Sequence, residues 1–118
     1  MHCFTGDASE LDAYLELGLC IGITGFICDE RRGMHLRDLV RRIPAERLMV
    51  ETDAPFLLPR DLKHARGRRN EPAYLPHVAA AVARYAGRDE AELRRSTSAV
   101  AFGLFGLAAR FPNALSPD

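Results

Sequence analysis

The chain has 118 residues, of which 47% are hydrophobic and 27% are charged, and its 16 basic residues balance its 16 acidic ones. This length and apolar content exclude an intrinsically disordered chain and are sufficient for one ordinary domain with a buried core. Because the formal net charge is zero, contact with a nucleic acid must depend on local clusters of basic residues rather than on the whole chain.

The cysteines and the first residues bear on the cellular location of the protein. Cys3, Cys20 and Cys28 form no C-x-x-C pair and are odd in number, which is typical of reduced thiols rather than of a disulfide framework. The first residues lack the basic and apolar regions of a signal peptide, and no stretch approaches the length of a membrane span. We therefore expect a cytoplasmic protein with no membrane partner.

Local signals in the first part of the chain predict a strand end, a helix and a second strand. Residues 1–4 have the composition of a strand that runs into a loop. Asp7 and Glu10 form a capping box, which predicts a helix of about ten residues ended by Gly18. Residues 19–24 are an apolar run of strand length.

The alternation of strands and helices continues through the middle of the chain. Gly22, inside the second predicted strand, indicates a bulge or a close approach of another part of the backbone. Apolar residues recur at helical spacing over residues 36–43, and Pro44 ends this predicted helix. The apolar or β-tolerant run from Leu48 to Thr52 is typical of a buried parallel strand.

Two carboxylates, Glu51 and Asp53, stand where this strand is expected to end. A buried carboxylate is costly without a partner, so at least one must reach water, a cation or a hydrogen-bond network. Residues two apart on a strand point to one face, so the two side chains could converge. Taken alone, Asp53 is explained as well by capping a turn before Pro55 as by binding a ligand.

Residues 56–70 predict a long loop rich in basic side chains. Loops longer than about 12 residues are uncommon in compact domains unless they carry function. Without the neighbouring carboxylates, a merely solvated basic loop would be the better interpretation. The loop holds one acid, Asp61, and the basic residues Arg60, Lys63, His64, Arg66, Arg68 and Arg69.

Two further helices are predicted near the end of the chain. Pro72 fits an early helical position, and the helix that follows it ends at Gly87. Asp89 and Glu92 repeat the capping box before a last helix. The expected buried face of that helix consists of Leu93, Thr97, Val100, Ala101 and Leu104.

Strands that alternate with helices predict right-handed β-α-β units and a parallel sheet, and therefore an α/β fold. Reactive groups in such sheets gather at the carboxyl ends of the strands. Both His2 and Asp53 lie at the carboxyl ends of predicted strands. An imidazole and a carboxylate are common ligands of zinc, manganese or magnesium, so this shared position favours a metal site.

Four motifs follow one another along the chain: H-C-F-T-G, I-G-I-T-G, E-T-D-A-P-F-L-L-P and R-R-N-E-P-A-Y-L-P-H-V. Together they resemble the TatD family of metal-dependent deoxyribonucleases, and the resemblance runs from His2 to Leu107. It implies a (β/α)8 TIM-type barrel with a divalent-metal site at its mouth, which hydrolyses phosphodiester bonds in DNA. Residues 1–107 would supply about strands 6 to 8 with their helices, and residues 108–118 would form a flexible tail.

The resemblance also implies roles for single residues. His2 would end the sixth strand and bind the metal, whereas Asp53 would end the eighth strand, bind the metal and orient or deprotonate the attacking water. One or two divalent ions (Mg, Mn or Zn) would activate that water and clamp the phosphate. Glu51 is expected to hold a ligand in place rather than touch the metal. The flanking phosphates would be held by Arg60, Lys63, Arg68 and Arg69.

Other polar residues are expected outside the metal site. Asn70 and Glu71 match the N-E-P motif of the family, which we interpret as fixing the loop against the following helix. His35, His64 and His77 are expected on loops or helix surfaces.

The chain also departs from the family. A (β/α)8 barrel takes roughly 250 residues, and the family's H-x-H after the first strand, its glutamate after the fourth and its histidine after the fifth have no counterpart here. We expect the carboxyl-terminal half of such a barrel, from a truncated reading frame, a split gene or an excised fragment. A second chain could complete the barrel. Two alternatives stay open: an inactive half barrel that associates through its sheet edges, and a related metal-dependent amidohydrolase or phosphotriesterase.

Overall fold

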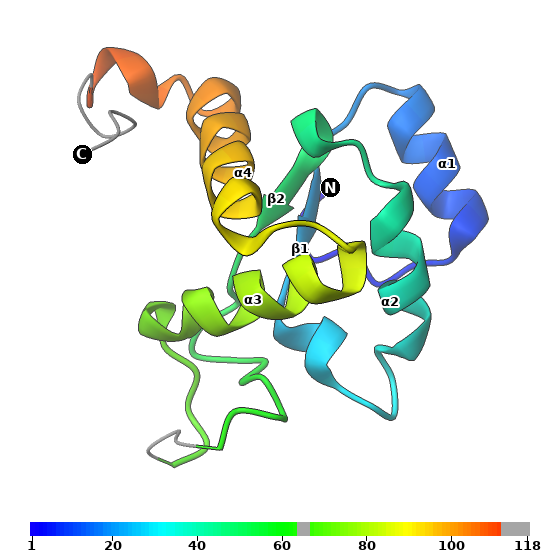
Figure 1. Cartoon of the computed structure of the whole chain (residues 1–118), viewed down its shortest axis with the longest axis vertical. Coiled ribbons are helices and arrows are strands. Elements are labelled where there is room, and N and C mark those ends of the chain that lie inside the picture. The colour runs from blue at the N-terminus through cyan, green and yellow to red at the C-terminus, as the bar shows by residue number, and fades with distance from the viewer. Residues whose placement is uncertain (64–66, 112–118) are drawn as a thin grey trace.

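The computed structural model describes residues 1–63 and 67–111 and is an α/β structure (Figure 1). Its helices and strands are α1 (Ala8–Glu16), β1 (Ile21–Ile23), α2 (Met34–Leu39), β2 (Leu48–Val50), α3 (Leu75–Ala86) and α4 (Glu90–Leu104). Short 3-10 turns connect or extend them: η1 (Gly25–Cys28), η2 (Val40–Arg42), η3 (Ala45–Arg47), η4 (Pro72–Tyr74) and η5 (Leu107–Ala109).

The two strands are parallel, as the sequence predicted, with Ile21 opposite Leu48 and Ile23 opposite Val50. The segment before α1 lies along the other edge of β1, because the Gly22 N–H donates to the Met1 carbonyl (2.8 Å) and the Gly22 carbonyl accepts from the Phe4 N–H (3.0 Å). This is the hydrogen-bond pattern of a parallel pair with one extra residue. Three parallel segments therefore lie side by side, in the spatial order residues 1–4, β1 and β2.

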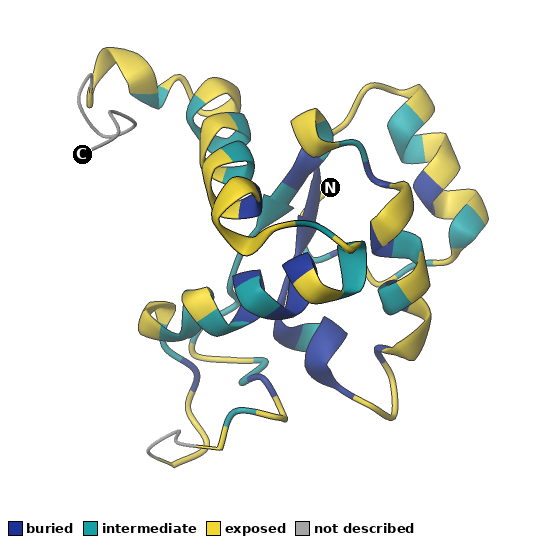
Figure 2. Ribbon diagram, viewed as in Figure 1, coloured by how far each residue is buried: buried dark blue, intermediate teal, exposed yellow. Residues whose placement is uncertain are grey.

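The core lies between the strands and the helices that cover them (Figure 2). Helix α3 contacts α2 on one side and α4 on the other, and both α3 and α4 contact β2. The side chains that bind these elements together are apolar and almost wholly inaccessible to solvent, which is the main favourable contribution to folding. They are Phe4, Leu11, Ile21, Ile23, Ile27, Leu36, Val40, Ile43, Leu48, Val78, Val82 and Leu93.

The helix ends follow the local signals. The Asp7 carboxylate accepts from the backbone N–H groups of Ser9 and Glu10, and the Glu10 side chain accepts from the Asp7 N–H, so the predicted capping box is present. Gly87 ends α3 with a φ of 68°, a left-handed conformation that favours glycine. At the start of α4, the Asp89 side chain accepts from the Glu92 N–H at 2.9 Å, but the return bond from the Glu92 side chain is not formed, so only half of the predicted capping box is present.

The helix predicted over residues 36–43 is divided in the structure. The α-helix ends at Leu39 and its last turn tightens into η2. Ile43 then adopts an extended conformation with a ψ of 120°. A residue before a proline is pushed out of the helical region, so Pro44 acts on the turn that precedes it.

The buried face predicted for α4 is mostly wrong. Of its five residues only Leu93 is buried, whereas Leu104 is 54% exposed. Helix α4 does contact the outer edge of β2, where the Val50 N–H donates to the Thr97 hydroxyl at 2.8 Å. Its other apolar residues line grooves rather than the core: Ala101 and Phe102 line one of about 360 Å³, and Val100 and Leu104 line another.

After α4 the chain makes the turn η5 before residues 112–118, which lie outside the described residues, as do residues 64–66 of the basic loop. Within the described part of the chain, none of the helices has the length and apolar character needed to cross a bilayer.

Candidate metal centre

The short segment before α1 carries His2 to the end of β2. Its two hydrogen bonds to Gly22 hold Met1 and Phe4 against β1, while Cys3 between them adopts a positive φ of 49°. The Cys3 N–H donates to the Oε1 atom of Glu51, which follows β2 directly. The backbone thus turns at Cys3 and places the imidazole of His2 beside the carboxylates that follow β2.

The His2 ring lies between two carboxylates. Its Nδ1 atom is 2.6 Å from Oε2 of Glu51, and its Nε2 atom is 2.8 Å from Oδ1 of Asp53. The imidazole is 66% exposed, whereas the side chains of Glu51 and Asp53 are 23% and 18% exposed. The structure therefore brings together the three residues that the sequence analysis singled out, at a point open to solvent.

The arrangement separates the roles of the two carboxylates. Because they meet opposite nitrogens of the ring, Glu51 and Asp53 do not converge on a common point. A bond from Nδ1–H to Glu51 leaves the Nε2 lone pair facing Asp53, and a nitrogen and an oxygen 2.8 Å apart can ligate one cation. His2 and Asp53 thus fit a shared divalent ion, and Glu51 fits a partner that orients the histidine.

The electrostatics of the pair act on His2. The hydrogen bond and then the negative charge of Glu51 raise the pKa of His2 above 6.5; burial opposes this rise, and the charge and hydrogen bond of Asp53 add to it. A proton on Nε2 and a cation would compete for the same position between the ring and Asp53.

We expect this raised pKa to be measurable in the chain kept free of metal by a chelator. A histidine with a raised folded-state pKa stabilises the fold below pH 6.5, and that contribution is lost as the pH rises through the folded-state pKa. NMR titration of the ring protons should give a pKa above 6.5 for His2. The variant Glu51→Gln should lower it, and a pKa equal in both proteins would contradict the arrangement.

Gly22 is needed for the position of Glu51. A Cβ atom built on Gly22 would overlap the Glu51 carboxyl group. The sequence predicted a bulge or a close approach of backbone at Gly22. The backbone of residues 1–4 does hydrogen-bond to Gly22, but the group that leaves no room for a Cβ atom is the Glu51 side chain. Any larger residue would push Glu51 away from His2 and Cys3.

The variant Gly22→Ala is expected to weaken divalent-metal binding about 10-fold to 100-fold, the usual range when a residue that orients a metal ligand is displaced. The fold should persist, since the Glu51 side chain can move outward. Gly103→Ala is the matched control, because nothing lies within 4 Å of a Cβ atom there. Calorimetric titration with Mn²⁺ measures both, and equal affinities would contradict the role of Gly22.

Asn70 fastens the loop that follows Asp53. Its buried side-chain amide donates to Oγ1 of Thr52 (3.1 Å) and to the carbonyls of Phe56 (2.7 Å) and Leu57 (3.3 Å). Its Oδ1 atom accepts from the Glu71 N–H at 2.9 Å, next to η4. Asn70 therefore ties the loop to the start of the following helix, as the sequence analysis expected.

Arg60 is held by the carboxylate of Asp29, the first residue of the charged run of residues 29–32. Asp29 is only 3% exposed, and its Oδ2 atom lies 3.0 Å from Nε of both Arg32 and Arg60. Burial alone would raise the pKa of Asp29, but the Arg31 N–H and the two guanidinium groups lower it. The two arginines flank a polar pocket of about 230 Å³ that also includes Gly25 and Leu57 and keep exposed side chains.

Within residues 1–63 and 67–111, no hydrogen bond or ion pair joins Lys63, Arg68 or Arg69 to the group of His2, Glu51 and Asp53. Arg69 lies 3.9 Å from Glu71, and Lys63 and Arg68 are exposed. Nε2 of His35 lies 3.0 Å from the Thr5 carbonyl oxygen, and His64 lies outside the described residues. Sequence reasoning missed Asp29 and Arg32, because a run of four charged residues resembles a solvated loop unless a distant partner such as Arg60 is known.

Comparison with known proteins assigns the family. The model of TatD-related DNases matches residues 1–106. The chain belongs to the TatD-related DNase family. It is 58% identical over 108 residues to the 3'-5' ssDNA/RNA exonuclease TatD of Klebsiella pneumoniae, and 59% identical over 109 residues to the protein of that name from Edwardsiella piscicida. These alignments cover 91% and 92% of this TatD-related chain.

Solved structures share the fold of this chain. The TatD homologue YJJV of Escherichia coli superposes with a TM-score of 0.78 at 26% identity over 90% of this chain. An uncharacterized amidohydrolase of Saccharomyces cerevisiae gives a TM-score of 0.76 at 26% identity over 89% of it. Only 39% of each of those structures is matched, and the two curated relatives are matched over 41% and 42% of their length. The chain thus spans about two fifths of the TatD proteins that it resembles.

Proposed function

We propose that this chain is the metal-binding part of a TatD-type nuclease that hydrolyses phosphodiester bonds in single-stranded DNA or RNA. The contact of His2 with Asp53 carries the proposal, because it offers a nitrogen and an oxygen to one cation at the open end of a parallel sheet. The family assignment and the names of the relatives, which are 3'-5' exonucleases of single-stranded DNA and RNA, support the substrate class.

We further propose that residues 1–107 correspond to about strands 6 to 8 of a (β/α)8 barrel. The three parallel segments in the order residues 1–4, β1 and β2 support this correspondence. So does the outer edge of β2, where a barrel would continue: the described residues form no further strand there, and the Val50 N–H donates to the Thr97 hydroxyl of α4 instead. The rest of the barrel, from a second chain, would cover this edge and supply further ligands.

In the proposed mechanism His2 and Asp53 hold the divalent ion, which when bound lowers the pKa of a water molecule and neutralises charge on the phosphate. The Glu51 carboxylate accepts a hydrogen bond from the Nδ1–H group of His2 and keeps Nε2 directed at Asp53. The Asp53 carboxylate would also orient the water and accept its proton. Magnesium, manganese and zinc all suit this ligand pair, in a site of one or two ions.

The basic side chains of the loop would bind phosphates that flank the scissile bond. Asp29 contacts the Nε atom of Arg60 and leaves its Nη groups available. Arg32 contacts the same Asp29 oxygen through its own Nε atom, so its Nη groups are available as well. Both guanidinium groups can then form paired hydrogen bonds with one phosphate. Lys63, Arg68 and Arg69 would add weaker contacts along the strand.

The test is a cleavage assay on a single-stranded oligonucleotide labelled at its 5' end, with Mg²⁺, Mn²⁺ or a chelator. The chain is assayed alone and after co-expression with the amino-terminal part of a curated relative. Metal-dependent shortening from the 3' end in either sample, lost on chelation, is the expected result. A stable complex without cleavage would instead favour the inactive half barrel.

The same samples separate the remaining alternative. The Saccharomyces cerevisiae structure is named an amidohydrolase, so amide, lactone and phosphotriester substrates are assayed in parallel. Turnover of these without cleavage of nucleic acid would overturn the proposed substrate class. A cytoplasmic location also remains a proposal, supported by three cysteines that are all free.

A further inference from the structure

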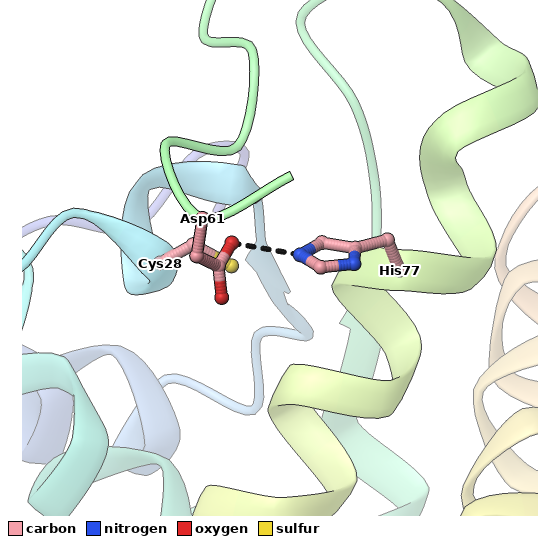
Figure 3. A group of neighbouring side chains, drawn as sticks. All are labelled: Cys28, Asp61 and His77. Carbon is pink, nitrogen blue, oxygen red and sulfur yellow. Dashed lines mark hydrogen bonds and ion pairs between the residues drawn. The ribbon is translucent and has the colours of Figure 1, made fainter. Parts of the chain in front are cut away.

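A second cluster of ligand-type side chains lies apart from His2, Glu51 and Asp53. Cys28 ends η1, Asp61 lies in the loop after β2, and His77 lies in the first turn of α3 (Figure 3). One ligand atom from each of these residues lies within 4.8 Å of the other two. The sequence gives no sign of this grouping, because the three residues are widely spaced along the chain.

The internal contacts of the cluster exclude a cysteine nucleophile. A thiol is activated by a histidine that accepts its proton, yet His77 Nε2 lies 2.7 Å from Asp61 Oδ1 and has no such contact with Cys28. Burial, followed by the charge and hydrogen bond of Asp61, raises the pKa of the Cys28 thiol to about 12, against the opposing charges of Arg37 and Arg84. A protonated thiol that is 1% exposed does not attack a substrate.

We propose that Cys28, Asp61 and His77 form a second metal site, which takes Zn²⁺ or a similar transition-metal ion. Sulfur, imidazole nitrogen and carboxylate oxygen are the ligand types that zinc prefers. Zinc lies about 2.3 Å from sulfur and about 2.0 Å from nitrogen or oxygen, and small movements bring ligand atoms that are already within 4.8 Å to such positions.

The surroundings of the cluster allow metal access and a fourth ligand. The side chains of His77 and Asp61 are 32% and 40% exposed, so an ion can enter from solvent. A pocket of about 380 Å³, lined by Cys28 and Asp61 among others, adjoins the cluster and can hold a water ligand. An entering ion would displace the thiol proton and replace the Asp61–His77 hydrogen bond.

The site would join three separate parts of the fold. Cys28 belongs to the segment after β1, Asp61 to the basic loop next to Arg60, and His77 to α3. A bound ion would therefore cross-link the loop to the body of the protein and raise its stability by mass action. This role is independent of the proposed nuclease site, since the two clusters share no residue.

Titration of the purified chain with Co²⁺ and then Zn²⁺ tests the proposal. Cobalt bound to a thiolate gives an intense sulfur-to-metal charge-transfer band in the near ultraviolet, which carboxylate and imidazole ligands do not give. We expect this band to appear at one equivalent, to disappear on addition of Zn²⁺, and to accompany a higher melting temperature. A chain that never shows the band at excess Co²⁺ would overturn the proposal.

Matched variants assign the band. Cys28→Ser should abolish it, and His77→Gln, which alters a half-buried surface residue, should weaken it even if Cys28→Ser fails to fold. Cys3→Ser and Cys20→Ser remove the other thiols, and His35→Gln removes a histidine elsewhere; all three should retain the band. Loss of the band in Cys3→Ser with retention in His77→Gln would place the metal beside His2 and refute the second site.

Discussion

Replacing Asp53 with asparagine is expected to lower metal-dependent cleavage by at least about 100-fold. Loss of a residue that only orients a ligand already costs about 10-fold to 100-fold, and Asp53 would both bind the ion and accept the proton of the water. Asparagine keeps the shape of the side chain and its contact with His2 Nε2 but removes the negative charge. The fold should be unchanged, because the Asp53 carboxylate is at the open end of the sheet rather than in the core.

The measurement combines the cleavage assay, with the co-expressed amino-terminal part where that is required, and calorimetric titration with Mn²⁺. Asp12→Asn is the matched control. Asp12 lies on α1, outside the group of His2, Glu51 and Asp53, and forms an exposed ion pair with Arg42. Exposed pairs of this kind contribute about 1 kcal/mol or less, so the control should behave as the parent chain. Full cleavage by Asp53→Asn would remove Asp53 from the mechanism.

Replacing Asn70 with alanine is expected to lower the free energy of unfolding by about 2 to 3 kcal/mol. The substitution leaves the carbonyls of Phe56 and Leu57 without their donor and the Glu71 N–H without its acceptor, in a place where the asparagine is only 4% exposed. Because the loop begins next to Asp53, metal affinity should fall as well. This would be the largest loss of stability caused by removal of one polar side chain in the loop.

Urea unfolding followed by circular dichroism measures the change. Ser98→Ala in the exposed part of α4 is the control and should alter stability by no more than about 0.5 kcal/mol. Asn70→Asp gives a sharper comparison, because a carboxylate cannot donate to the two carbonyls and should destabilise at least as much as alanine. Unchanged stability in both variants would show that the loop is held by other contacts.

Local chemistry made several features predictable from the sequence. The capping box of Asp7 and Glu10, and the helix end at Gly87, depend on residues a few positions apart, so their pattern in the sequence is also their pattern in space. The alternation of strands and helices led to the parallel pairing of β1 with β2. His2 and Asp53 were singled out for a related reason, since each lies at the carboxyl end of a segment that runs parallel to β1.

Contacts between distant segments were decided only by the tertiary structure. Asp29 is in a charged run that looks solvated, yet it is buried because Arg60, from the loop after β2, supplies a partner for its charge. The packing of η1, the basic loop and α3 brings together Cys28, Asp61 and His77. Their spacing in the sequence does not predict this cluster.

The same distinction separates the candidate site from its surroundings. Period-two alternation predicted that Glu51 and Asp53 share a side of the chain, but the turn of the backbone at Cys3 decided that they meet opposite nitrogens of His2. Helical periodicity likewise predicted an apolar stripe on α4, whereas its exposure depends on what lies against it. The sequence by itself determined the local elements and the ligand-type residues; packing between segments decided their burial, their partners and their charge environment, because those depend on atoms far apart in the chain.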